Sequence, residues 1–479
     1  MKQPAYKWIQ DNQKHLADMS DKIWEHAELG LWETKSSKLI ADELAKHGFN
    51  VQLGVSGMPT AIVATWGTGK PTIGIQGEYD ALPGISQKKT AKKEPLKEGH
   101  AGHGCGHNIH GVSGMAGAIA TRYALEEADI KARVKFFGTP AEENYAGKVH
   151  MVKEGHYDDV DACLSHHPSS MNTARLSSST AVNGVKFHYY GKTSHAAGSP
   201  EQGRSALDAV ELMNVGVNYL REHIIQDARI HYVIEAGGGQ PNVVPDYARS
   251  WYYIRAPERD QLDPIYARVL KIAEGAAMMT ETTLKVEFID GLYNIIPNKV
   301  VAETVVKNMR EAGAPTYTKK ELDFAAEIAK SFPKEQKVDM LRKIKIPGWE
   351  KYVEVDLPTD ILDPTGDGET MAGSSDVGDV SWKCPTVEFG TTVNVLGAPG
   401  HSWQFVTMSA STVAHKSLAF AAKTIAGTAL NLITQPELLK KAKKEHADRL
   451  KGRTYKTPLP DDCLPPLEIA KVAAMKAQE

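Results

Sequence analysis

A glycine-rich segment near residue 105 carries the residue types of a metal site. Cys105 and His107 offer a soft thiolate and an imidazole two residues apart, and both groups bind transition metals. The glycines around them carry no Cβ and tolerate positive φ, so the two side chains can converge on one ion. The whole segment reads His100-Ala101-Gly102-His103-Gly104-Cys105-Gly106-His107-Asn108-Ile109-His110.

Three further segments complete a candidate metal-hydrolase site. Glu142 and Glu143 follow the apolar segment 134–140, which is typical of a buried strand that ends in a loop, so an ordinary solvated surface explains them poorly. The other segments contain His166-His167, before Pro168, and Gly400-His401. His166 remains possible in place of His167. The expected metal ligands are Cys105, His107, Glu143, His167 and His401.

These groups match the needs of metal-assisted amide hydrolysis. Such a reaction requires a Lewis acid, a carboxylate base and a donor for the oxyanion. Glu142 is the expected base, which takes a proton from water and passes it to the leaving amine. If two divalent ions share the site, the thiolate of Cys105 is suited to bridge them. Asp80 follows an expected strand and can orient an imidazole ligand from behind, although a simple turn would also explain it.

Three polar residues further along the chain are candidates for contacts with a substrate. His195 follows an expected strand and is suited to donate to an oxyanion. Asn242 follows the glycine run 237–239, where the backbone can approach a ligand closely. Arg255 follows the aromatic segment 251–253 and could hold a substrate carboxylate through two parallel hydrogen bonds. An ordinary polar surface would explain each of the three about as well.

The composition is that of a soluble globular protein. The 479 residues exceed one ordinary core, so two domains are expected, and 42% of them are hydrophobic. A net charge of −3 gives no electrostatic case for nucleic acid or an anionic membrane. No apolar run approaches the roughly 20 residues of a membrane helix, and no signal-peptide core begins the chain. Four cysteines are too few for a disulfide framework and favour a cytoplasmic setting.

Helix and strand patterns predict an α/β fold with an inserted unit. Residues 1–182 alternate helical and strand patterns, which predicts a central sheet sandwiched by helices. The order strand–helix–strand–strand–helix–strand over 183–291 is typical of a ferredoxin-like α+β unit. Residues 292–479 return to α/β character. We therefore expect one catalytic domain, formed by 1–182 and 292–479, that an α+β domain over 183–291 interrupts.

Six motifs, taken in their order and spacing, resemble those of the metallo-amidohydrolases that include aminoacylase, glutamate carboxypeptidase and the indole-acetyl-amino-acid hydrolases. The resemblance implies a zinc-peptidase-like catalytic domain with a central mixed sheet. It also implies that the inserted unit serves as a dimerisation or lid domain. The motifs are Glu78-Tyr79-Asp80-Ala81-Leu82-Pro83, Gly104-Cys105-Gly106-His107, Thr139-Pro140-Ala141-Glu142-Glu143, Ser194-His195-Ala196-Ala197, Asn242-Val243-Val244-Pro245 and Gly400-His401-Ser402.

The resemblance also implies roles for individual residues. The residue matching Glu142 is the base, and the five expected ligands hold two divalent ions. A Cys/His/Glu set suits zinc, and the resemblance permits manganese. The histidine matching His195 reaches into a partner subunit's site, which implies a homodimer or a heteromer with a related subunit. The residues matching Asn242 and Arg255 contact the carboxylate end of the substrate.

A closer resemblance within the same family concerns the substrate. The segments 373–382 and 401–404 resemble those of members that cleave p-aminobenzoyl-glutamate, which implies an N-aroyl amino acid as the substrate. Other N-acyl amino acids or dipeptides remain alternatives, as does a chain that depends on a partner subunit for catalysis. A structural zinc protein fits less well, because its closed site would leave Glu142 without a purpose. The polar segments 87–97 and 314–362 are expected to be solvated loops or the edge of a lid.

Overall fold

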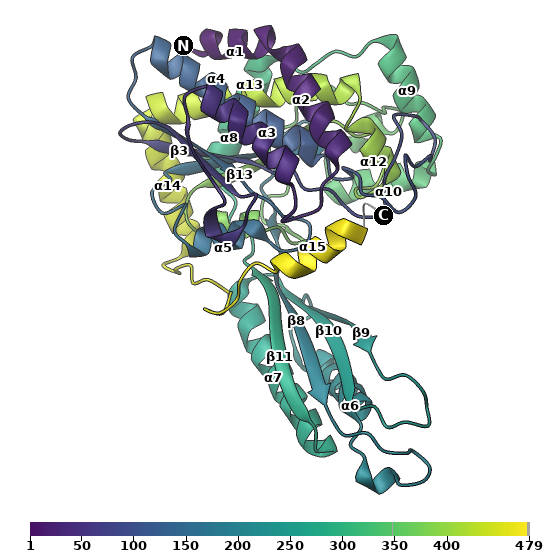
Figure 1. Ribbon diagram of the computed structural model, residues 1–479. Helices are drawn as coiled ribbons and strands as arrows, with labels where there is room; N and C mark the ends of the chain where they lie inside the picture. The colour runs from purple at the N-terminus through teal and green to yellow at the C-terminus, as the bar shows by residue number, and fades with distance from the viewer. Residues whose placement is uncertain (347, 477–479) are drawn as a thin grey trace.

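The computed structural model describes residues 1–346 and 348–476, which form a large unit and a smaller one that projects from it (Figure 1). The large unit contains a seven-stranded sheet of order β1-β2-β4-β3-β5-β13-β6. The four strands β4, β3, β5 and β13 are parallel, and the pairs β1/β2, β2/β4 and β13/β6 are antiparallel. The strands are β1 (Asn50–Leu53), β2 (Ile62–Gly67), β3 (Thr72–Gly77), β4 (Arg133–Gly138), β5 (Ala162–Ser169), β6 (Thr173–Ala174) and β13 (Thr386–Thr392).

Helices cover both faces of this sheet, which confirms the expected mixed sheet sandwiched by helices. Alternate residues of a strand face opposite sides, so Leu164 belongs to one core and Cys163 to the other. The larger core packs against α1 (Lys2–Asp11), α2 (Gln13–His26), α3 (Thr34–Lys46), α4 (His107–Glu127), α8 (Lys299–Ala312), α13 (Thr412–Thr434) and α14 (Pro436–Leu450). The opposite core packs against α5 (Gly147–Lys153), α11 (Val377–Ser381) and α15 (Leu467–Lys476).

Small residues bring α4 unusually close to the sheet and to α13. A Cβ on Gly114 would lie 2.2 Å from the carbonyl oxygen of Gln76 in β3. A Cβ on Gly117 would lie 2.5 Å from Cγ2 of Ile425 in α13. The helix is therefore fixed across the sheet, with His107 at its first residue.

The small unit is a four-stranded antiparallel sheet with two helices on one face. Its strand order β11-β8-β10-β9 and its element order confirm the ferredoxin-like pattern. Its own core lies between the sheet and the two helices, and β9 forms one edge. The elements are β8 (Ala181–Tyr190), α6 (Ala206–Leu220), β9 (Arg229–Ala236), β10 (Tyr247–Ala256), α7 (Arg259–Thr280) and β11 (Thr283–Leu292).

The expectation that 314–362 is a solvated loop or lid edge is wrong. This segment contains α9 (Lys319–Ala329) and α10 (Lys334–Ile344), whose residues Ile328 and Leu341 are fully buried. Ile328 packs with Val395 and Ala398, so the segment supports the loop that leads to His401. The charged residues dominate the composition, but helical spacing gathers the few apolar ones on one buried face.

Two further observations concern the helices. The helix α15 was not expected from the sequence, and it lies at the junction between the two units (Figure 1). No helix within the described residues is long and apolar enough to cross a bilayer.

Candidate metal centre

The candidate site lies where the parallel strands of the large sheet end. Glu78 follows β3 directly, Glu142 lies four residues after β4, and His167 lies near the end of β5. The carboxyl ends of adjacent parallel strands lie along one edge of a sheet, which is where α/β proteins commonly bind ligands. His401 comes from the loop between β13 and α12 (Trp403–Met408).

Two glycines allow the Cys105 loop to fit into this edge. Gly106 has φ of 77°, and a Cβ there would lie 2.9 Å from Cβ of Pro168. A Cβ on Gly104 would lie 3.2 Å from Cα of His401, whose backbone N–H donates to the carbonyl oxygen of Gly104 at 2.9 Å. The absence of side chains therefore brings the β5 and His401 segments close to Cys105.

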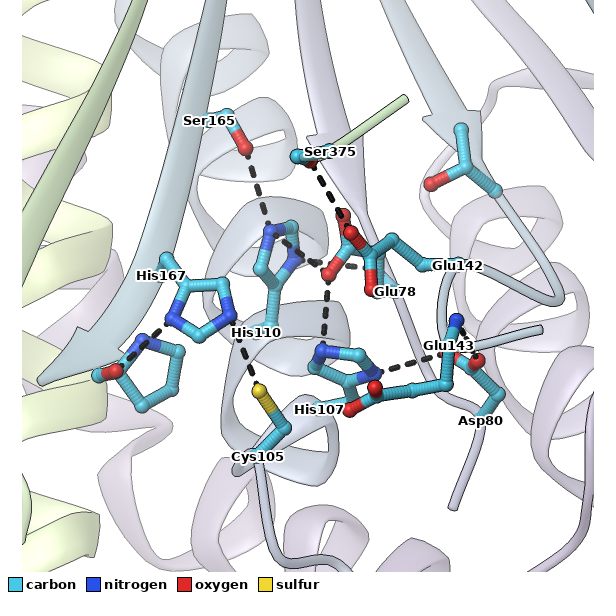
Figure 2. A network of polar contacts seen from close by, with 12 residues as sticks. Glu78, Asp80, Cys105, His107, His110, Glu142, Glu143, Ser165, His167 and Ser375 are labelled. Carbon is cyan, nitrogen blue, oxygen red and sulfur yellow. Dashed lines mark hydrogen bonds and ion pairs between the residues drawn. The ribbon is translucent and has the colours of Figure 1, made fainter. Parts of the chain in front are cut away.

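The expected ligands form two overlapping groups that could hold a metal ion, and Figure 2 shows all of their members except His401. In each group, one ligand atom from every member lies within 4.8 Å of the others. Cys105 belongs to both, which is the arrangement that a bridging thiolate requires. The first group is Cys105, His107 and His167, and the second is Cys105, Glu143 and His401.

The two adjacent histidines of β5 have different surroundings. The Nε2 atom of His167 lies 3.3 Å from Sγ of Cys105. His166 is fully buried on the other side of the strand. Its two ring nitrogens contact the hydroxyls of Ser113 and Thr391, each at 2.7 Å. The geometry therefore favours His167 as the ligand, because both nitrogens of His166 already have partners.

Asp80 holds His107 in the orientation that ligation needs. Its Oδ1 lies 2.8 Å from Nδ1 of His107, and its Oδ2 accepts the backbone N–H of Glu143 at 3.0 Å. With Nδ1 occupied by the carboxylate, Nε2 is left as the coordinating nitrogen.

Unpaired buried atoms test whether these residues fit a metal. Among the described residues, Nε2 of His107 and Oε1 of Glu143 are buried and make no hydrogen bond, and each has only an ion-pair contact, with Oε2 of Glu78 at 3.1 Å and with Nε2 of His401 at 3.3 Å. Buried polar atoms without partners are costly, and a divalent cation would satisfy both. Burial and the nearby Glu143 raise the pKa of the Cys105 thiol, so a thiolate there requires a cation beside it. The donor set therefore fits divalent metal ions.

Glu142 has the environment of a general base. Ser375 donates a hydrogen bond to its Oε1 at 3.0 Å (Figure 2). One oxygen of Glu142 lies within 4.8 Å of ligand atoms of His107 and Glu143. Burial, followed by the carboxylates of Glu78 and Asp376, raises the pKa of Glu142 well above its ordinary value. A carboxylate of raised basicity can accept a proton from water and release it again.

A buried ionic network behind Glu142 was not assigned from the sequence. Nζ of Lys148 lies 2.6 Å from Oε1 of Glu78 and 2.7 Å from Oδ1 of Asp376. All three residues are at most 1% exposed. Burial lowers the pKa of Lys148, but the two carboxylates raise it well above its ordinary value. The lysine therefore stays charged. Glu78 and Asp376 lie in motifs that the sequence offers, whereas a single lysine in a short helix gives no such signal.

The three substrate candidates lie at opposite ends of the small unit. Arg255 is near the large unit, and its Nη1 donates to Oγ of Ser374 at 2.9 Å, beside Ser375. His195 and Asn242 are exposed and neighbouring, since the N–H of Ala196 donates to the carbonyl oxygen of Asn242 at 3.0 Å. Both follow strands that run toward the distal end of the unit (Figure 1). The strand β10 separates them from Arg255 by roughly 25 Å.

Because of this separation, the three substrate candidates do not form one group within a single chain. Within one chain the structure does not bring Asn242 or His195 to Arg255 or to the metal ligands. It does bring together Asp80, Glu142 and the five expected ligands.

Comparison with known proteins assigns a family. Residues 74–404 match the model of Peptidase family M20/M25/M40. One of the subunits of the p-aminobenzoyl-glutamate hydrolase of Escherichia coli is 38% identical over 480 residues, which cover 97% of this chain and 99% of that protein. The Xaa-Arg dipeptidase of Mus musculus is 29% identical over 468 residues, which cover 94% of this chain and 93% of that protein.

A solved structure supports the fold. A dinuclear metal-binding peptidase of the M20 family from Bacillus subtilis superposes with a TM-score of 0.56 at 17% identity, covering 89% of this chain and 99% of that one. The family match and the 38% identical relative extend through the residues that converge in the site. The chain belongs to Peptidase family M20/M25/M40 and is a metal-dependent hydrolase of amide bonds.

Proposed function

We propose that the protein cleaves the amide bond of an N-aroyl amino acid, with p-aminobenzoyl-glutamate as the substrate and p-aminobenzoate and glutamate as the products. The observation that carries the proposal is the placement of Glu142 beside two ligand groups that share Cys105. The relative that is 38% identical bears the name of a hydrolase of this substrate. That similarity supports the choice of the aroyl group.

The chain's own residues can perform each proton transfer of this reaction. The two ligand groups that share Cys105 would hold two divalent ions, zinc or manganese. Such ions would polarise the amide carbonyl and make water more acidic. Glu142 takes a proton from the attacking water and delivers it to the leaving nitrogen, so the amine departs neutral. The hydrogen bond from Ser375 keeps the carboxylate of Glu142 directed into the site.

Arg255 is our candidate for binding the substrate's carboxylate. Its guanidinium lies beside Ser374, one residue from the serine that holds Glu142. A planar guanidinium can form two parallel hydrogen bonds with a carboxylate. This contact would fix the amino-acid half of the substrate relative to the base.

His195 and Asn242 would act in the site of a partner subunit. Both are exposed, and they follow the ends of β8 and β9 that lie opposite the Arg255 end of β10, away from their own chain's metal ligands. The small unit also exposes large apolar side chains, among them Tyr219, Val233 and Met278, at 74%, 57% and 81%. Such surfaces are common at protein interfaces. The partner is a second copy or a related subunit, assembled in the cytoplasm.

The test is release of p-aminobenzoate by the purified chain. Protein reconstituted with manganese or zinc is compared with chelator-treated protein, and an Xaa-Arg dipeptide is the competing substrate. We expect metal-dependent cleavage of p-aminobenzoyl-glutamate. Cleavage of the dipeptide alone would replace the aroyl substrate with a dipeptide. No cleavage of either, with two metals bound per chain, would point to a missing partner subunit.

A further inference from the structure

A cavity of about 700 Å³ lies between the two units, and Glu143, one of the expected metal ligands, is among the residues that line it. Asn144 and Tyr145, from the same loop as Glu143, also line it. The volume falls within the range of small-molecule sites. None of the roles assigned above uses this space.

One wall of the cavity is the helix-free face of the small unit's sheet. Trp251 and Tyr253 are two residues apart on β10, so both point to this face, and their ring centroids are 5.6 Å apart. Lys186 pairs directly with Trp251 across the sheet, and its Nζ lies 4.6 Å from the indole centroid. The residue between the two aromatics, Tyr252, is buried in the core on the opposite face.

The other wall comes from the C-terminal segment 459–469, which includes Leu464 and Ile469. This segment is attached to both units. Nζ of Lys153 donates to the carbonyl oxygen of Pro460 at 2.8 Å, and buried Leu459 packs with Phe288 of the small unit. The helix α15 continues it across the junction (Figure 1).

The lining suits a flat aromatic group. Indole and phenol rings offer a large surface for stacking at little cost in side-chain entropy. Leu464 and Ile469 are 76% and 54% exposed although they border the cavity, so an occupant would cover apolar surface there. Arg255 does not itself line the cavity; its guanidinium donates to Ser374 and lies 5.3 Å from the ring centroid of Tyr253, which does line it. The guanidinium therefore adjoins the aromatic end of the cavity, so a carboxylate held by Arg255 and an aromatic group in the cavity can belong to one substrate.

We infer that this cavity is the subsite for the acyl half of the substrate, that it takes a planar aromatic acyl group, and that the C-terminal segment forms its outer wall. The inference rests on the proposed function, because it assigns the acyl half of the same amide. It assigns specificity to Trp251, Tyr253 and Ile469, none of which belongs to the motifs of the metal site.

The kinetic test compares two substrates that differ only in the acyl group, p-aminobenzoyl-glutamate and N-acetyl-glutamate. Trp251→Ala should lower kcat/KM for the aroyl substrate by about tenfold or more and leave the acetyl substrate within about twofold. Trp251→Phe should retain most of the activity, because the aromatic face remains. An equal loss for both substrates would overturn the inference.

The C-terminal wall has a matched pair of variants on one helix. Ile469 and Val472 in α15 are 54% and 53% exposed, but only Ile469 lines the cavity. Ile469→Ala should lower kcat/KM for the aroyl substrate by about threefold or more, and Val472→Ala should leave it unchanged. Equal effects of the two variants would remove the segment from the subsite. If Trp251→Ala lowers the melting temperature, the result for Ile469→Ala decides instead, because a half-exposed side chain can be truncated with little effect on folding.

Binding distinguishes failure of this inference from failure of the proposed function. In the full-length, metal-reconstituted Glu142→Ala protein, calorimetry measures the affinity for p-aminobenzoyl-glutamate and N-acetyl-glutamate without turnover. Adding Trp251→Ala should weaken only the aroyl ligand, by about tenfold. If wild-type protein hydrolyses neither substrate but shows this selective binding, the reaction is wrong and the cavity assignment stands. Unchanged affinity for the aroyl ligand would overturn the assignment.

Discussion

Glu142 lies among the expected metal ligands, but its surroundings suit a proton carrier rather than a ligand. Ser375 occupies one of its oxygens, and burial among carboxylates raises its pKa. Glu142→Ala should therefore lower kcat by at least about a hundredfold while metal content stays the same. Activity and metal analysis on the same preparation check this, with the exposed Glu127→Ala as the control. A parallel loss of metal would make Glu142 a ligand.

Substitution of Cys105 is expected to lower the metal content as well as the activity, because this residue belongs to both ligand groups. Cys105→Ser replaces a soft thiolate with a hydroxyl that binds transition metals weakly. We expect fewer than two metal ions per chain and a corresponding loss of activity, measured by elemental analysis after dialysis. Cys384→Ala, at a buried thiol outside the site, serves as the control. Unchanged stoichiometry in Cys105→Ser would remove this residue from the site.

At the scale of elements, α5 and α11 are joined behind the base by a buried ion network. Lys148 on α5 lies between Glu78 and Asp376, and all three are almost fully buried. Lys148→Met would leave two carboxylates buried without their cation, which typically costs about 3–5 kcal/mol. We expect a clearly lower thermal midpoint than for the control Lys131→Met, whose lysine is exposed. Equal midpoints would mean that the carboxylates are neutral in the native protein.

The same region contains a carboxyl whose titration should affect stability. Asp379 on α11 is fully buried, accepts the N–H of Tyr293 at 3.1 Å, and accepts the hydroxyl of Tyr455 at 2.9 Å. Burial raises its pKa to about 7. The folded state therefore holds this proton more tightly than the unfolded state does. The contribution of this proton to the free energy of unfolding is complete below about pH 4 and is lost as the pH rises to about 7.

Asp379→Asn should remove this pH-dependent component. Relative to wild type, the free energy of unfolding of the variant should rise by about 2.6 kcal/mol between pH 5 and pH 8. Thermal midpoints of both proteins at the two pH values measure the difference. A wild-type-minus-variant difference that stays constant with pH would contradict a raised pKa at Asp379.

At the scale of the whole molecule, the small unit separates residues that the family resemblance groups together. Arg255 lies at its near end, whereas His195 and Asn242 follow the distal ends of β8 and β9. Distal residues can serve catalysis only in another chain's site. The domain division at 182/183 and 291/292 stays a prediction, as does the role of the small unit as a dimerisation or lid domain.

Subunit mixing tests this arrangement. If His195 acts in trans within a homodimer, His195→Ala and Glu142→Ala are each inactive, yet a hybrid dimer contains one complete site. Random exchange should therefore restore about one quarter of wild-type activity. Activity is measured after subunit exchange has been verified with differently tagged chains. Exchange without recovery would contradict a role for His195 in a second copy of this chain.

The sequence by itself determined the residue types of the site and the elements that carry them. Cysteine, histidine and glutamate in glycine-rich or strand-end segments specify local chemistry, and the two periodicities of helix and strand specify local structure. These patterns predicted the element order of the inserted unit, which the structure confirms, and they selected Asp80, Glu142 and the five expected ligands, which the structure brings together. The roles of these residues stay predictions. The choice between His166 and His167 needed the structure, because adjacent residues of a strand point to opposite faces and the sequence does not say which face holds the site.

The tertiary structure alone decided which distant segments meet. A lysine such as Lys148 has the same local sequence features whether it is solvated or buried between two carboxylates, so only packing reveals the network. The apolar faces of α9 and α10 were hidden by a charged composition, and α15 had no predicted counterpart. The cavity beside Trp251 and Tyr253 is lined by residues from five segments that are far apart in the chain. Contacts of this kind depend on how the elements pack, and no local pattern encodes them.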